Sequence, residues 1–144
     1  MAQQPPRPTP YTLVALRDYR PRGITFDTGA LIALERRRQH ISKVYLAAVH
    51  DRVPITVPTA VIAEWWRGRS DVAERILGGV RVEPLEARLS RFAGEAMASV
   101  PGATVVDAIV MASAALRGDI VYTSDVADLE LLGVYFPAVR VFST

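Results

Sequence analysis

The sequence predicts a single α/β domain built on a parallel β-sheet that helices cover on both faces. Short runs rich in β-branched residues alternate with longer segments of helical periodicity, which is typical of a parallel sheet. The length of 144 residues fits one domain with a substantial core. Half of the residues are hydrophobic and 22% are charged, as in ordinary globular proteins.

The first half of the chain contains two strands, each followed by two helices. The apolar run at 24–27 predicts a buried strand. The expected elements that follow are helices at about 28–38 and 41–51, a strand at 54–57, a helix opened by Pro58-Thr59, and a helix at 71–77. Gly78-Gly79 ends the last of these helices, because glycine readily takes the left-handed conformation of a helix end.

The second half continues the alternation. The expected elements are a strand at 80–82, a helix from Pro84 to just before Pro101-Gly102, a helix from Thr104 to Arg117-Gly118, a strand at 120–123, a helix at 125–132 and a strand at 139–142. The sequence contains no internal repeat and no sign of a second domain. These elements therefore belong to one sheet with helical crossovers.

Residues 1–22 are expected to form a proline-rich tail that precedes a domain at 23–144. The apolar piece Tyr11–Leu16 could add an edge strand or pack on the surface. No apolar run is long enough for a signal peptide or a bilayer span, so the expectation is a soluble cytoplasmic protein. The absence of cysteine excludes a disulfide framework and a thiolate zinc site.

The basic residues are almost all arginine. Lys43 is the sole lysine among seventeen basic residues, and the formal net charge is only +2. Arginine binds phosphate bidentately and would suit a nucleic-acid surface. A GC-rich genome, in which arginine codons replace lysine codons, produces the same composition. Charge alone therefore does not identify a partner.

Four acidic residues stand where a parallel sheet places its ligands. Such sheets bind ligands outside the carboxyl ends of their strands, at the point where the strand order reverses. Asp27 ends the first expected strand, and Asp125 directly follows the fourth. Asp107 lies in the first turn of the helix after Pro101-Gly102, and Glu64 lies in the helix after the second strand. The four acids thus come from four separate segments.

Most of these acids also have a purely structural explanation. Asp125 could be the N-cap of a helix. Asp107 follows Thr104 with the spacing of a capping box. Glu64 could pair with Arg67 at i,i+3 on a solvated helix face. These alternatives remain open at the level of single residues.

Asp27 is harder to explain structurally, because it lies between an apolar strand and an apolar helix. A carboxylate in such a position is costly unless it has a partner. Carboxylates gathered at one sheet edge raise each other's pKa unless a cation is bound. Oxygen ligands suit magnesium or manganese, and such an ion can orient and deprotonate water without a histidine base. Together the four acids predict a metal site for phosphoryl chemistry.

The acidic segments resemble the four motifs of PIN domains, in order and approximate spacing. They are ITFDTGALI at 24–32 with Asp27, VPTAVIAE at 57–64 with Glu64, VVDA at 105–108 with Asp107, and TSDVAD at 123–128 with Asp125 and Asp128. The resemblance covers about residues 23–143 and is greatest to the VapC toxins of type II toxin–antitoxin pairs. It implies an α/β, PIN-like three-layer fold with a parallel sheet in strand order 3-2-1-4-5 flanked by helices.

The resemblance also implies a function. The family consists of Mg²⁺- or Mn²⁺-dependent endoribonucleases that leave a 5′-phosphate and a 3′-hydroxyl, usually form homodimers, and are silenced by a cognate antitoxin. By position, Asp27, Glu64, Asp107 and Asp125 would hold the metal, Asp128 would be an auxiliary acid, and Thr28 and Ser124 would supply nearby hydroxyls. Many relatives place another acid just before the third motif, where this chain has Ala103-Thr104. That departure leaves the substrate contacts open.

Three rival classes fit less well. A phosphoaspartate receiver domain needs a lysine near the last strands, and Lys43 lies far from them. A haloacid-dehalogenase-like phosphatase would carry a second aspartate two residues after the first, where Gly29 stands. A catalytically silent PIN-like RNA- or protein-binding module is the remaining alternative, and the intact acidic set argues against it.

Other features have more than one interpretation. Arg36–Arg38 could follow an RNA backbone, bind an acidic antitoxin segment, or form a solvated helix face. One of Trp65 and Trp66 is expected in the core and the other partly exposed, where it could contact a second copy or an antitoxin. His40 and His50 belong to no motif and are expected at the surface.

Overall fold

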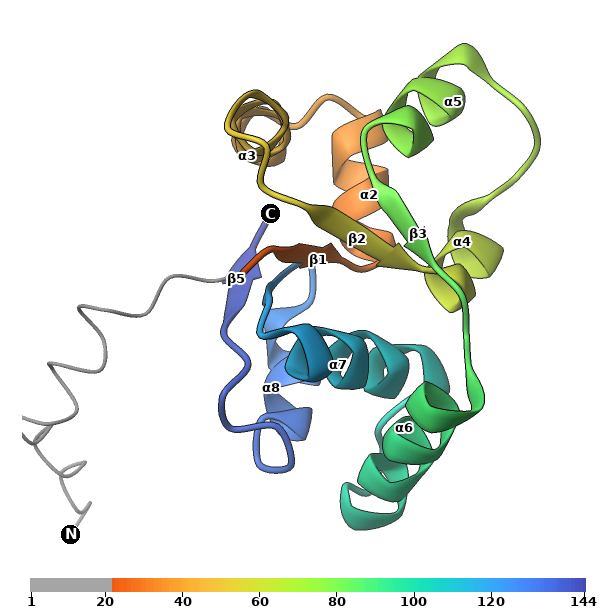
Figure 1. The fold of residues 1–144 in the computed structure, drawn as a ribbon, viewed down its shortest axis with the longest axis vertical. Helices are drawn as coiled ribbons and strands as arrows, with labels where there is room; N and C mark the ends of the chain where they lie inside the picture. The colour runs from red at the N-terminus through yellow and green to blue at the C-terminus, as the bar shows by residue number, and fades with distance from the viewer. Residues whose placement is uncertain (1–21) are drawn as a thin grey trace, which may run out of the picture.

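The computed structural model describes residues 22–144 (Figure 1). The piece Tyr11–Leu16 and the rest of the tail up to residue 21 lie outside the described residues. Five parallel strands form one sheet in the order β3-β2-β1-β4-β5. The strands are β1 (Ile24–Phe26), β2 (Ile55–Pro58), β3 (Arg81–Glu83), β4 (Ile120–Thr123) and β5 (Val141–Ser143). The predicted strand order is confirmed.

Helices cover both faces of this sheet. They are α2 (Thr28–Glu35), α3 (Gln39–His50), α4 (Thr59–Trp65), α5 (Asp71–Gly78), α6 (Ala87–Ser99), α7 (Val105–Arg117) and α8 (Val126–Leu132). Figure 1 shows α2, α3 and α5 on one side of the sheet and α6, α7 and α8 on the other. Helix α4 packs against both α2 and α7. The expected three-layer α/β architecture is therefore confirmed.

The register of the sheet places the reversal of strand order at its centre. In β1, Thr25 lies opposite Thr56 of β2 and Val121 of β4. The chain leaves β1 toward β2 on one side, whereas β4 and β5 pair on the other side. The carboxyl ends of β1 and β4 consequently lie next to each other, with Phe26 opposite Tyr122. Asp27 and Asp125 follow these two strand ends.

Helix α2 is shorter than the sequence predicts. It ends at Glu35 because Arg37 takes a left-handed conformation with φ of 56°. The amide of Arg37 donates to the carbonyl of Leu34 at 3.0 Å, and the amide of Arg38 donates to that of Ala33 at 2.9 Å. These two bonds are those of a Schellman motif, which usually has glycine at the left-handed position. The stop was missed because an arginine occupies it.

Apolar side chains fill the space between the sheet and each helical layer. Phe26 and Leu31 are fully buried on the α2 side, and Met111 of α7 is fully buried on the other. Burying a side chain of this size contributes about 1.5–3 kcal/mol. Trp65 is buried and Trp66 is only partly so, as predicted. The core therefore fixes the positions of α2 and α7, which carry two of the acidic motifs.

A partly buried polar network lies between α7 and the sheet, and the sequence did not predict it. Arg117, in the last turn of α7, donates from Nε to Asp119 Oδ2 at 2.9 Å and from a second nitrogen to Thr25 Oγ1 at 2.7 Å. It also pairs with Glu83, which accepts from Ser113 Oγ at 2.6 Å. Asp119 is only 3% exposed. One guanidinium thus joins α7, β1, β3 and the start of β4.

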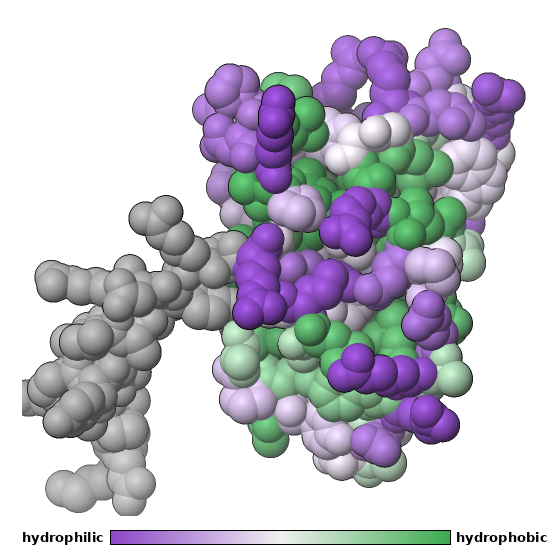
Figure 2. All heavy atoms as spheres, viewed as in Figure 1, coloured by the Kyte–Doolittle hydropathy of each residue, from purple (hydrophilic) through white to green (hydrophobic). Residues whose placement is uncertain are grey.

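Apolar side chains also reach the surface. Figure 2 shows hydrophobic residues between the hydrophilic ones over both helical layers. Leu46 and Val134 are the most exposed large hydrophobic residues among those described, at 64% and 86%. Scattered exposed apolar residues are normal on globular proteins. No helix within residues 22–144 is long and apolar enough to cross a membrane.

Candidate active site

Asp27 is the most buried acid of the candidate site, with 8% of its surface exposed. It is the N-cap of α2, and its Oδ1 accepts a hydrogen bond from the Ala30 amide at 2.8 Å. The pKa of Asp27 is raised to about 6, mainly by burial and to a lesser extent by the nearby charges of Asp107 and Glu64. Hydrogen bonds from the Thr123 hydroxyl and the Ala30 amide act in the opposite direction. The main cause is burial rather than the mutual repulsion that the sequence predicts.

Asp107 takes part in the N-terminal cap of α7 and also lies near the other acids. Thr104 is the N-cap of α7 and accepts from the Asp107 amide at 3.2 Å, so the predicted cap spacing is confirmed. Burial also raises the pKa of the Asp107 carboxyl, and the charges of Asp128, Glu64 and Asp125 add to this effect. The Thr104 hydroxyl also hydrogen-bonds the Asp107 carboxyl and lowers its pKa, so the cap engages the side chain as well as the amide.

Asp125 and Asp128 lie at the start of α8. Asp125 is its N-cap, with Oδ1 3.4 Å from the Asp128 amide, as the structural alternative predicts. Its own amide donates to Thr123 Oγ1 at 2.9 Å. Hydrogen bonding to Asp125 and then the charge of Asp125 raise the pKa of Asp128. Both residues are exposed, and the charge of Asp125 also raises the pKa of Asp107.

Glu64 is exposed on α4 but connects to the start of α2. Its Oε1 accepts from the Thr28 hydroxyl at 2.5 Å. Arg67 donates to the backbone carbonyl of Trp66 at 2.8 Å, so the alternative of a Glu64–Arg67 pair does not describe the observed contacts. Thr28 therefore holds Glu64 at the edge of the sheet where Asp27 lies. This places one of the two predicted hydroxyls beside the acids.

Gly29 lets the β4–α8 connection approach α2. A Cβ atom at this position would overlap Ser124 Oγ and lie 2.9 Å from Ser124 Cβ. Only a residue without a side chain fits between them, which is one reason for glycine at a close backbone approach. Ser124, the second predicted hydroxyl, thus lies against the first turn of α2. The contact joins the segment of Asp27 to the segment of Asp125.

Solved structures with the same architecture come from toxin–antitoxin complexes. A chain of the VapBC2 complex from Rickettsia felis, bound to a DNA fragment from its promoter, has a TM-score of 0.69 at 10% identity, covering 84% of this chain and 98% of that one. A chain of DNA-bound VapBC from Salmonella typhimurium has a TM-score of 0.63 at 15% identity, covering 84% and 97%. A chain of a toxin–antitoxin complex from Klebsiella pneumoniae has a TM-score of 0.64 at 18% identity, covering 81% and 95%.

This chain has a PIN-like fold. The likeness spans most of the chain and nearly all of each neighbour, and the strand order is the one that the four motifs implied. No protein-family model and no curated protein matches the sequence. At these identities the likeness supports the fold, while activity must be argued from the site.

The acids of the PIN-like fold suit a hard cation by their chemistry. All four are oxygen donors, and Asp27 and Asp107 have raised pKa values, for which a bound cation would compensate. Their side chains do not converge on one point: within residues 22–144, no three His, Cys, Asp or Glu side chains are grouped closely enough to hold one ion. Asp27 and Glu64 are instead turned to local hydrogen-bond donors. The four-acid metal site therefore stays a prediction.

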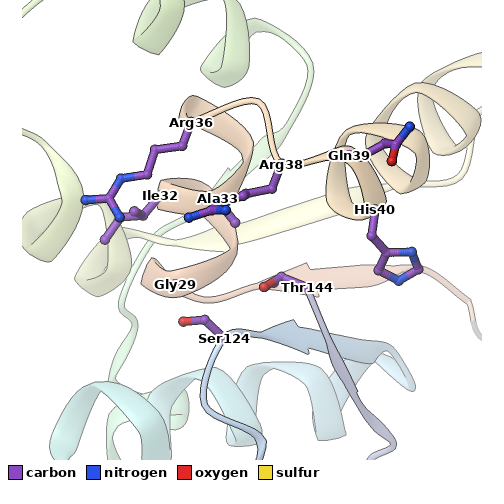
Figure 3. A pocket seen from close by; sticks show the side chains of 9 residues that line it. All are labelled: Gly29, Ile32, Ala33, Arg36, Arg38, Gln39, His40, Ser124 and Thr144. Atoms are coloured by element: carbon purple, nitrogen blue, oxygen red, sulfur yellow. The ribbon is translucent and has the colours of Figure 1, made fainter.

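A cavity of about 640 Å³ opens beside the acids in the PIN-like fold (Figure 3). Gly29 and Ser124 line it on the side of the acidic motifs, and Arg36, Arg38 and His40 line it on the side of α2 and α3. Both histidines are exposed, as predicted, but only the position of His40 relates to this cavity. No pattern in the sequence indicates that His40 lines a cavity, because the cavity forms only when the end of α2 meets β4 and the C-terminal strand.

Proposed function

We propose that this chain is a metal-dependent endoribonuclease and the toxin of a toxin–antitoxin pair. The observation that supports the proposal is electrostatic: near the adjacent ends of β1 and β4, where ligands of parallel sheets bind, acids from four segments interact, which helps to raise the pKa values of Asp27 and Asp107. The fold shared with chains of toxin–antitoxin complexes supports the toxin assignment.

Asp27, Glu64, Asp107 and Asp125 would hold Mg²⁺ or Mn²⁺ in this proposal. Such an ion would lower the pKa of a bound water and stabilise negative charge on the phosphate. The chain itself orients the acids: the Ala30 amide and the Thr123 hydroxyl hold Asp27. Thr28 holds Glu64. Asp128, whose pKa is raised, would keep a proton at its carboxyl more readily than an ordinary aspartate, in keeping with an auxiliary role.

A cleavage assay tests the activity. Purified protein should cut RNA with Mg²⁺ or Mn²⁺ and stop in EDTA, and the fragments should be substrates for a 5′-phosphate-dependent exonuclease. Asp27→Asn should abolish cleavage while the circular dichroism spectrum stays unchanged. Asp51→Asn is the matched control, since Asp51 is an exposed acid that precedes β2 at the other end of the sheet. Undiminished cutting by Asp27→Asn would place the site elsewhere.

The absence of three converging acids among the described residues favours one alternative, a catalytically silent PIN-like module that binds RNA or protein. RNA binding without cleavage in either metal would support this alternative and refute the nuclease. An RNA-cleaving protein would exclude it.

The antitoxin and a homodimer belong to the same proposal. Toxin–antitoxin neighbours support a cognate partner protein. A small gene beside this one should encode a protein that co-purifies with the chain and stops its cleavage of RNA. Analytical ultracentrifugation of the chain alone should give the mass of a dimer. A neighbouring product that neither binds nor inhibits would remove the toxin assignment and leave the nuclease assignment intact.

A further inference from the structure

We propose that the cavity beside the acids binds one unpaired nucleotide of an RNA strand, with its phosphate on Arg36 and Arg38 and its base against His40 and Phe142. The inference rests on the proposed function, because it names the form of RNA that reaches the same site. It also makes a binding prediction that is independent of cleavage. Single-stranded RNA is then favoured over a duplex, since only an unpaired base can stack on a protein ring.

The end of α2 separates the three consecutive arginines. The left-handed conformation of Arg37 turns the chain, so that Arg36 and Arg38 line the cavity beside the acids while Arg37 lines a different hollow with Tyr45 and Leu46. A solvated helix face would not divide the run in this way.

The two cavity arginines are available for a ligand. Within residues 22–144, no ion pair or hydrogen bond is formed by the side chain of Arg36 or Arg38. Both side chains are among those that line the cavity, and Figure 3 shows them leaving the chain at the end of α2. Guanidinium groups bind phosphate through two parallel hydrogen bonds. Their positive charge would also offset the repulsion between an RNA backbone and the neighbouring acids.

A row of aromatic rings ends at Phe142, two residues before Thr144, which lines the cavity. Phe26, Tyr122 and Phe142 are register partners on β1, β4 and β5, so their rings form a row across one face of the sheet. Tyr122 lies 6.3 Å from Phe26 and 5.6 Å from Phe142, and the last pair is stacked. The row runs from the fully buried Phe26 to Phe142, which is 41% exposed. Its outer end therefore offers a ring to solvent.

His40 lies between this row of rings and the cavity. Its ring lies 6.1 Å from that of Tyr122, is exposed, and lines the cavity together with Thr144. The Thr144 amide donates to the Thr123 carbonyl at 3.0 Å, which continues the β5 pairing. By strand alternation, Thr144 and Phe142 face the same side. Cation, hydroxyl and ring thus surround one space whose volume is typical of small-molecule sites.

Fluorescence anisotropy with a labelled single-stranded RNA decamer in EDTA tests the phosphate contact without metal-dependent cleavage. The double variant Arg36→Ala/Arg38→Ala should lower affinity at low salt. It should also reduce the slope of log affinity against log salt by about 0.7 for each lost phosphate contact. Arg88→Ala/Arg91→Ala is the matched control, because it removes two exposed arginines from α6 on the opposite side of the sheet. The control should leave affinity and slope close to wild type.

The base contact is tested with two histidines of one helix. His40→Ala should weaken single-strand binding roughly tenfold, with an unchanged salt slope, because stacking involves no phosphate. His50→Ala, an exposed histidine at the other end of α3, should bind like wild type. Phe142→Leu keeps an apolar side chain but removes the ring, and it should weaken binding in the same way as His40→Ala.

Four outcomes would overturn this inference. They are equal losses in the two double-arginine variants, wild-type binding by His40→Ala, equal affinity for a matched duplex, and equally strong competition by a glutamate-rich decapeptide, which would indicate a protein ligand. The proposed nuclease fails separately: a protein that binds the single strand as expected but cuts no RNA with magnesium keeps this subsite and loses the activity. If the double-arginine variant binds and cleaves RNA like wild type, the nuclease assignment stands and the proposed subsite is lost.

Discussion

Two groups of carboxylates lie on the same sheet, and they differ in whether a cation reaches them. Asp119 and Glu83 both contact Arg117, so one cation within the chain offsets part of their negative charge. Asp27 is nearly as buried as Asp119 but is held by neutral donors, and its pKa rises to about 6. A buried carboxylate without a cation costs stability. The first group therefore completes the fold, whereas the second is suited to a ligand that the chain does not supply.

The largest expected effect comes from breaking the group around Arg117. Arg117→Met should destabilise the protein by about 3 kcal/mol, because it leaves Asp119 buried and Glu83 partly buried without a cationic partner. Urea denaturation at pH 7 measures the loss. Arg88→Met on α6 is the control, since Arg88 is exposed. A loss below 1 kcal/mol would mean that water replaces the guanidinium, and the contrast between the two groups would disappear.

At Asp27 the opposite effect on stability is expected: removing its charge should stabilise the protein, whereas Arg117→Met destabilises it. Its folded pKa of about 6 lies above the ordinary 3.8, so the folded state is favoured when Asp27 is protonated. Wild-type stability should therefore decrease as pH rises from about 4 to above 6, by at most about 3 kcal/mol from this residue. Asp27→Asn has no charge there and can still cap α2. In EDTA it should be more stable than wild type at pH 8 and nearly equal at pH 4.

Urea denaturation of wild type and Asp27→Asn at both pH values gives the test, with Asp51→Asn as an exposed control. A stability difference that is the same at pH 4 and pH 8 would show that the charge of Asp27 costs nothing in the folded state. The comparison with Asp119 would then rest on hydrogen bonds alone.

A smaller effect is expected at Asp107, which is only partly buried. Asp107→Asn should raise the melting temperature in EDTA, because burial and the nearby acids disfavour the charged form. Magnesium should stabilise this variant less than wild type, since stabilisation by a ligand follows its affinity. Thermal melts with EDTA and with excess magnesium measure both changes. Equal magnesium shifts in the two proteins would remove Asp107 from the metal ligands.

The sequence predicts the acidic site better than the network around Arg117. Asp27 and Asp125 follow recognisable strand ends, so local patterns and the rule for parallel sheets bring them together. Arg117 and Thr25 are 92 residues apart and belong to no motif. Their contact depends on how α7 packs against the sheet, which hydrophobic periodicity does not specify.

Within the site, the sequence identifies the acids but does not predict their burial or most of their hydrogen-bond partners. Asp125 caps α8, and its charge also acts on Asp107, so the cap interpretation is confirmed while its role as a metal ligand stays a prediction. The deep burial of Asp27 depends on the contact between its helix and the β4–α8 connection. The end of α2 was misplaced for another reason: an arginine, not a glycine, occupies its left-handed position.

The contact between Gly29 and Ser124 has a consequence for how the site can vary. It joins the two halves of the acidic group by packing the Ser124 side chain and amide against the main chain of Gly29, where a Cβ atom has no room. The spacing of these halves is thus set by one main-chain position and one short side chain, and substitutions elsewhere in the two loops do not act on this contact directly. The site can change its ligands by exchanging side chains around a fixed frame, but it has little freedom to adapt by moving its loops apart.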